Sequence, residues 1–265
     1  MNNPPEWNEP PSDSPGERDP NQVFTTAILV EMGLGVAAVV IASLLGPDCR
    51  AYIPEFSQVE LARVFGGLVM GLVFTVPMIL GMALVKRLKL PAIEELRRLG
   101  DHPMMTTLLQ LSMVELIVIS LCAGVGEELL FRGWLMPAIA GDITWLQSTE
   151  PALASDLSSP GDWFGGHGWL GWIWGHPESS VWEWWSRDGS VNWLLAWAAS
   201  SVLFGFAHPI SKAYFVITAL LGVYLGFLLL LTGNLLVPIA AHATYDAVEL
   251  WLAKQELGSE PVQDP

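Results

Sequence analysis

Residues 61–85 read LARVFGGLVMGLVFTVPMILGMALV, and Arg63 is the only charged residue among them. A helix needs about 20 consecutive, mostly apolar residues to cross the hydrocarbon core of a bilayer. This run is long enough to do so, and Pro77 within it is expected to kink the helix. The stretch therefore predicts a membrane-spanning helix.

The same apolar character recurs on both sides of this stretch. The mean hydropathy of the chain is +0.43. Only 15% of the residues are charged, whereas a soluble domain carries about a quarter. The sequence predicts an all-α polytopic bundle of six to seven membrane helices, with further apolar helices over 23–45 (interrupted only by Glu31), 104–140, 191–208, 213–231 and 235–253.

The stretch 104–140 decides the number of spans. As one α-helix it would run roughly 55 Å, well beyond a hydrocarbon core of about 30 Å. Gly124 and Gly126 are the expected break or kink. If this stretch is one kinked helix, the chain has six spans and both termini lie in the cytoplasm. If it forms two spans, the chain has seven, and the orientation of every later helix in the membrane is inverted. Lys212 and Lys254 favour six, because cytoplasmic ends of spans are enriched in basic residues.

The remaining segments differ from the apolar runs in composition. The chain divides into a Pro-rich acidic tail expected to be disordered (1–22), a first pair of spans with an amphipathic surface helix (23–103), a second group of spans (104–254) and a polar tail (255–265). The surface helix, over 86–98, is rich in basic residues and is expected on the cytoplasmic side. An inserted loop at 141–190 is rich in tryptophan, which prefers the headgroup zone.

Several classes of function do not fit this composition. The formal net charge is −15 and no basic stripe occurs, which excludes a nucleic-acid binder. Cys49 and Cys122 lie far apart, so they predict neither a disulfide framework nor a Cys-x-x-Cys metal site. The chain contains no G-x-S-x-G nucleophile elbow and no H-E-x-x-H zinc signature.

Residues 126–133 read GEELLFRG and bring three ionisable side chains into an apolar helix. Such groups are costly in a membrane and by default mark a functional site. Glu128 and Arg132 are four residues apart, so they share a helix face and can pair. Glu127 points about 100° away, where it is suited to act as a general base. A Glu–Arg pair that only locked helix packing would leave the second glutamate unexplained.

Two histidines belong to the later apolar helices. His208 ends the stretch FGFAH, and taken alone it would be a satisfied histidine at a helix end. His242 and Asp246 share a helix face in the stretch HATYD. Taken alone, they are as well explained by a hydrogen-bonding pair between membrane helices.

The expected depths of these residues connect the clusters. Glu127 and His208 lie roughly 20 and 26 Å from the ends of two antiparallel helices that flank one loop. These two residues are therefore expected at similar depth. His242 lies only about 10 Å into its helix. It joins the others only if that helix tilts or starts deep in the membrane, which Pro238 permits.

The three motifs together resemble a known family. Glu-Glu-x-x-x-Arg, Phe-x-x-x-His and His-x-x-x-Asn/Asp, in this order on separate apolar helices, are typical of the CPBP family. This family includes the type II CAAX prenyl proteases and the bacteriocin-processing proteins, and it is also called Abi. The resemblance is carried by 127–133, 204–208 and 242–246, and it spans roughly 112–252. It implies that 104–254 is a catalytic membrane domain.

The resemblance also implies a catalytic set: Glu127, Glu128, Arg132, His208, His242 and Asp246. Glu127 would activate a water molecule with the help of His208, and Glu128 and Arg132 would form a supporting pair. His242 and Asp246 would stabilise the oxyanion or orient the water. The family often has Asn at the last position, and an amide can donate to an oxyanion, whereas an ionised carboxylate cannot. A charged Asp246 would instead orient His242 or bind a metal.

The sequence therefore predicts an intramembrane endopeptidase that cuts a membrane-associated peptide or protein with a Glu-activated water. Two mechanisms stay open: a metal-free one, and one with a divalent metal such as Zn held by Glu127, His208 and His242. The alternative function is non-catalytic: a bacteriocin-immunity factor, a scaffold or a proton-coupled transporter. The expected partners are the lipid bilayer and the substrate, with no nucleic acid, and the expected location is the plasma membrane.

Overall fold

The protein is described by a computed structural model over residues 19–54, 61–88, 93–94, 103–141 and 190–259. Within these ranges all regular structure is helical and no strand occurs, so the predicted all-α fold is confirmed. In chain order the helices are α1 (Pro20–Leu45), α2 (Leu61–Val85), α4 (Pro103–Gln110), α5 (Met113–Glu128), the π-helix η1 (Leu129–Leu135), α6 (Met136–Ala140), α10 (Ser190–Phe206), α11 (Lys212–Thr232) and α12 (Leu236–Ser259).

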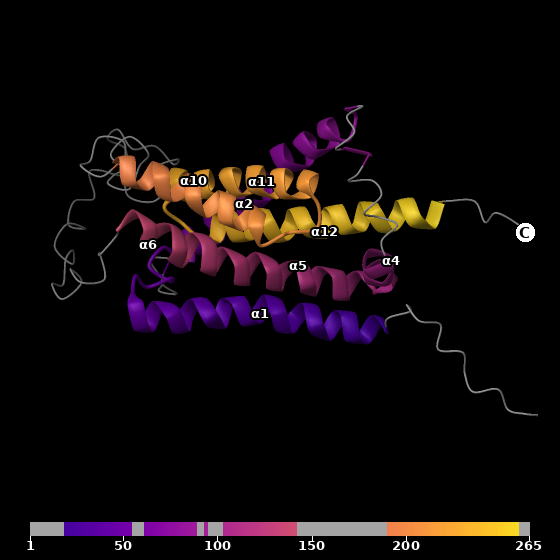
Figure 1. Cartoon of the computed structure of the whole chain (residues 1–265), viewed down its shortest axis with the longest axis horizontal. Coiled ribbons are helices and arrows are strands. Elements are labelled where there is room, and N and C mark those ends of the chain that lie inside the picture. Colours follow the sequence, from indigo (N-terminus) through magenta and orange to yellow (C-terminus); the bar gives the residue numbers. More distant parts are fainter. Residues whose placement is uncertain (1–18, 55–60, 89–92, 95–102, 142–189, 260–265) are drawn as a thin grey trace, which may run out of the picture.

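The helix α5 occupies the middle of the bundle. It packs against α1 on one side and against α12 on the other, and α2 covers α12. The helices α10 and α11 pack against each other, and they contact α6 and α12 respectively. Figure 1 shows that the long helices run side by side, and that α1 begins at the same end of the bundle at which α12 ends. The helices on which the predicted site residues lie therefore come together around α5 and η1.

The prediction that the helix breaks or kinks at Gly124 and Gly126 is wrong. Residues 113–140 stay helical throughout, and the chain instead bends by 117° between α4 and this stretch. Ser112 starts the new helix because its side chain accepts from the backbone N–H of Glu115, whose carboxylate accepts from the N–H of Ser112. The glycines serve close packing instead: a Cβ on Gly126 would lie 2.0 Å from the carbonyl oxygen of Glu31 on α1.

The helices suit a membrane in length and composition. Three of those described, α1, α2 and α11, are long and apolar enough to cross, and α4 together with residues 113–140 adds a fourth if the bent pair is one span. The outer faces of α1 and α2 expose large apolar side chains such as Leu44 and Leu80, at 76% and 63%. These faces fit a lipid environment. The count of six to seven spans stays a prediction.

The turn between α11 and α12 lies inside the bundle. Asn234 is 3% exposed, and its side-chain amide donates to the carbonyl of Arg63 at the start of α2. Leu235 is fully buried, and its backbone N–H donates to the carbonyl of Tyr52. Because this turn is held by residues from two other segments, α12 starts deep in the protein. The depth of this turn in the membrane stays a prediction, but within the bundle His242 lies within reach of the other site residues.

Some expected features lie outside the described residues. These are most of the acidic tail and of the amphipathic surface helix, the Trp-rich loop at 142–189 and the last residues of the C-terminal tail. At the edges of these regions the helices are longer than expected. The helix α1 begins at Pro20, capped by the Asp19 side chain, and α12 continues to Ser259.

Candidate active site

The helix α5 and the π-helix η1 carry the first group of site residues. Glu128 and Arg132 are both fully buried, and the Arg132 Nη1 donates to the Glu128 Oε1 over 2.8 Å. The Nη2 of Arg132 donates to the carbonyl of Gly222 on α11, over 3.1 Å. The pairing expected from the four-residue spacing is therefore present, and it ties η1 to a second helix. Single-turn π-helical segments occur frequently at functional sites.

His208 follows directly after α10, and its orientation comes from the Phe-x-x-x-His spacing. Its Nδ1 lies 2.9 Å from the carbonyl oxygen of Phe204, four residues earlier. A carbonyl only accepts hydrogen bonds, so Nδ1 must be the donor. The Nε2 atom is left facing the Glu127 Oε1 at 3.5 Å. Phe204 also packs between the two site histidines, with ring centroids 5.0 Å from His208 and 5.8 Å from His242.

His242 on α12 joins the remaining carboxylates. Its Nδ1 lies 3.0 Å from the Glu128 Oε1, and its Nε2 lies 3.3 Å from the Asp246 Oδ2 and 3.8 Å from the Glu127 Oε2. The His242 side chain is 8% exposed and the Asp246 side chain is 31% exposed, so the cluster is more open on the Asp246 side. The two ring nitrogens of His242 therefore face different carboxylates: Nδ1 faces Glu128, and Nε2 faces Asp246 and Glu127.

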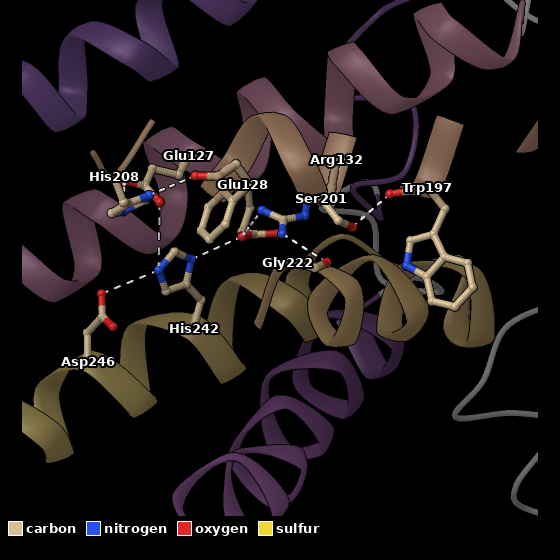
Figure 2. A network of polar contacts seen from close by, with 10 residues as sticks. Glu127, Glu128, Arg132, Trp197, Ser201, His208, Gly222, His242 and Asp246 are labelled. Carbon is tan, nitrogen blue, oxygen red and sulfur yellow. Dashed lines mark hydrogen bonds and ion pairs between the residues drawn. The ribbon is translucent and has the colours of Figure 1, made fainter. Parts of the chain in front are cut away.

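All six predicted site residues thus form one contiguous network. Figure 2 shows Glu127 between the two histidines, and Glu128 between Arg132 and His242. The two adjacent glutamates point to different neighbours: Glu127 to His208 and the Nε2 of His242, and Glu128 to Arg132 and the Nδ1 of His242. The geometry is compatible with separate tasks for the two glutamates.

Buried polar atoms without a hydrogen-bond partner also concentrate here. Among the described residues, the network contains three such atoms: the Oε2 of Glu127, the Oε2 of Glu128 and the Nε of Arg132. A buried polar atom left unpaired costs about 1–3 kcal/mol. A network built only to hold helices together would be expected to satisfy these atoms. The unpaired Oε2 of Glu127 in particular is suited to accept a hydrogen bond from a water molecule.

Two further residues lie close to the network, and sequence reasoning did not select them. Glu31 on α1 interacts electrostatically with Glu127, with both site histidines and with Asp246. An isolated carboxylate in an apolar helix is a signal that could have identified it. Tyr214 on α11 packs beside His208, with ring centroids 6.0 Å apart. No sequence motif marks Tyr214.

A metal was one of the predicted possibilities, with Glu127, His208 and His242 as its ligands. Imidazole and carboxylate are both ligands that Zn²⁺ accepts. Among the described residues, however, no group of three or more His, Cys, Asp or Glu side chains is arranged to hold a metal ion. The metal stays a prediction, and the mechanism below is written with the side chains of the chain alone.

Comparison with known proteins places the chain in a family. The family model described as Type II CAAX prenyl endopeptidase Rce1-like matches residues 109–248, more than half of the 265 residues. No curated protein and no solved structure matches significantly. The matched range contains all six site residues and begins after α1 and α2. Together with its long apolar helices, this makes the chain an integral membrane protein, and it belongs to the Rce1-like type II CAAX prenyl endopeptidase family, a family of membrane endopeptidases.

Proposed function

We propose that this protein is an intramembrane endopeptidase that hydrolyses a peptide bond of a membrane-associated peptide or protein, using a water molecule activated by Glu127. One observation carries the proposal. The Glu127 carboxylate is buried between the Nε2 atoms of His208 and His242, and its Oε2 has no hydrogen-bond partner among the described residues. A general base needs an accepting atom within reach of the proton that it removes.

In the first step, Glu127 takes a proton from the water while the water oxygen attacks the carbonyl carbon of the scissile bond. A tetrahedral intermediate with a negatively charged oxygen results. Glu127 then returns the proton to the leaving nitrogen, and the C–N bond breaks to give a carboxylic acid and an amine. His208 supports this role because its Nδ1 is held by the Phe204 carbonyl, which keeps its Nε2 directed at Glu127.

The remaining site residues, Arg132, Glu128 and Asp246, hold His242 in position. Arg132 compensates the charge of the fully buried Glu128, and Glu128 accepts a hydrogen bond from the Nδ1 of His242. Asp246 lies on the opposite nitrogen of the same ring. These contacts support an orienting role for Asp246, as expected for a charged residue at a position where the family often has Asn. Held in this way beside Glu127, His242 would orient the attacking water from α12.

The substrate class and the location are part of the proposal. The family name points to substrates that end in Cys-a-a-X and carry a prenyl group on that Cys, and a lipid anchor would hold such a peptide at the membrane. A farnesylated peptide ending in Cys-a-a-X is therefore the first substrate to test, beside an unmodified transmembrane peptide. The plasma membrane stays the predicted location.

The experiment that tests this function follows the oxygen of the attacking water. The purified full chain in detergent micelles is incubated with each peptide in water enriched in ¹⁸O, and the products are analysed by mass spectrometry. A glutamate-activated water predicts that one ¹⁸O enters the new carboxylate in a single turnover. A protein that cleaves neither peptide would support the non-catalytic alternative.

A further inference from the structure

The hydrolysis of an amide bond requires donors for the oxyanion that forms on the carbonyl oxygen. The site network is poor in them. Glu127, Glu128 and Asp246 only accept hydrogen bonds when they are ionised. The N–H groups of Arg132 that have partners are taken by Glu128 and the Gly222 carbonyl.

The histidine donors are engaged in the same way. The Nδ1 of His208 is held by the Phe204 carbonyl, and the Nδ1 of His242 by Glu128. Both Nε2 atoms face carboxylates, His208 towards Glu127 and His242 towards Glu127 and Asp246. A donor that is already directed at an anion is not available for a second one without breaking that contact.

Tyr214 lies at the first turn of α11, immediately beyond the loop that holds His208. Its position is fixed: the Ser211 side chain accepts from its backbone N–H over 3.1 Å, and its carbonyl accepts from the Thr218 hydroxyl over 2.9 Å. Its ring packs against the His208 ring at 6.0 Å, with an interplanar angle of 55°. The backbone of α11 and the ring of His208 therefore hold Tyr214 beside His208, which itself faces Glu127.

The hydroxyl of Tyr214 has no hydrogen bond to any described residue, yet Tyr214 lies close enough to Asp246 and Glu127 to interact electrostatically with both. Packing against His208 would need only the ring, which phenylalanine also provides. A hydroxyl beside two carboxylates that uses neither as an acceptor is available as a donor. The one other donor of the described network without a partner is the Nε of Arg132, whose side chain is fully buried.

We propose that Tyr214 is a further catalytic residue, whose hydroxyl donates a hydrogen bond to the carbonyl oxygen of the scissile bond as that oxygen becomes negative. This inference rests on the proposed function. Tyr214 would then approach the substrate carbonyl from α11, while Glu127 delivers the water from α5.

Tyr214→Phe removes the hydroxyl and keeps the ring. The test measures kcat and KM of the purified full chain on the farnesylated peptide, with Tyr224→Phe as the matched control. Tyr224 lies on the same helix, and its hydroxyl donates to the Phe74 carbonyl over 2.9 Å, away from the network. Removal of one oxyanion donor typically lowers kcat by about 10²–10³-fold. Tyr214→Phe should show such a loss at unchanged KM and melting temperature, whereas Tyr224→Phe should keep kcat and melt at a lower temperature.

Other outcomes overturn the inference in distinguishable ways. If Tyr214→Phe keeps the wild-type kcat while Glu127→Gln is inactive, Tyr214 is not the donor and the proposed function stands. A rise of KM alone would make Tyr214 a substrate-binding residue. A fall of kcat matched by a lower melting temperature would make it structural. A wild-type protein that cleaves neither peptide overturns the proposed function and this inference together.

Discussion

Adjacent glutamates take different partners in this protein because the helix directs them to different sides. Glu128 points at Arg132 one turn later and is fully buried, whereas Glu127 points at the two histidines. The division follows from the angle of about 100° between neighbouring helical residues. At the residue scale, the partner of each glutamate therefore indicates its role. Glu128, paired with Arg132, supports the site, whereas Glu127, which faces the histidines, is available for chemistry.

The buried pair gives a stability prediction. Arg132→Leu leaves Glu128 charged and without its cation, and such a change typically costs about 3–5 kcal/mol. The free energy of unfolding, measured by SDS titration in mixed micelles, should fall by that amount. The double variant Arg132→Leu/Glu128→Leu should recover part of the loss, because it removes the uncompensated charge. Arg50→Leu is the matched control: its ion pair with Asp48 is solvent-exposed and should contribute little. An Arg132→Leu protein as stable as the wild type would contradict the pairing.

Part of the site could be predicted from spacing alone. The spacing of four from Glu128 to Arg132 predicts a contact along one helix face, and that contact is present. The approach of His242 could not be predicted in this way. It depends on the buried turn at Asn234, which is held by backbone carbonyls from distant segments. Contacts of that kind leave no periodic signal in the sequence.

At the scale of elements, the close approach of α1 and α5 determines where Glu127 lies. Gly126, directly before Glu127, packs against the backbone of α1 at Glu31 and Gly35. The length of the stretch 104–140 predicts an interruption, and glycine is the residue type at which a break is expected. The interruption lies at Ser112, where a capping box starts a new helix. Small residues such as glycine are enriched where membrane helices pack closely.

This packing gives a prediction for two glycines. Gly126→Ala introduces a Cβ where the Glu31 carbonyl leaves no room, so α1 and α5 must separate. Overpacking of this kind typically costs about 1–3 kcal/mol, and the shift of Glu127 should abolish cleavage. Gly33→Ala on α1 is the control, because its Cβ would meet nothing within 4 Å. The thermal melting curves of both variants check the prediction. Equal melting temperatures would show that the approach at Gly126 is not tight.

At the scale of the whole molecule, the described chain begins and ends at the same end of the bundle (Figure 1). The helices α1 and α5 run away from that end and α12 returns to it. The apolar helices can be located from the sequence because hydropathy is a local property, and α2 begins and ends at the predicted residues. The number of spans depends on how each helix sits in the bilayer, and hydropathy alone does not decide it.

The arrangement of the ends predicts the topology. Reporter fusions placed before Pro20 and after Ser259 should both be accessible from the same side of the membrane, and the loop bias of basic residues assigns that side to the cytoplasm. Cysteine-labelling of the two ends with a membrane-impermeant reagent, in intact and in lysed cells, measures this directly. Labels on opposite sides would require an odd number of spans and would contradict the six-span reading.

The central claim is that Glu127 is the base that activates water, and Glu127→Gln tests it most directly. Glutamine keeps the volume and much of the hydrogen-bonding capacity but cannot take a proton. A general base typically contributes about 10²–10⁴-fold to the rate, so cleavage of the membrane-tethered peptide should fall by at least that factor at an unchanged melting temperature. Glu115→Gln on the same helix is the control, because glutamine can still complete the capping box. Full activity in Glu127→Gln, or a loss of activity matched by a lower melting temperature, would contradict the catalytic assignment.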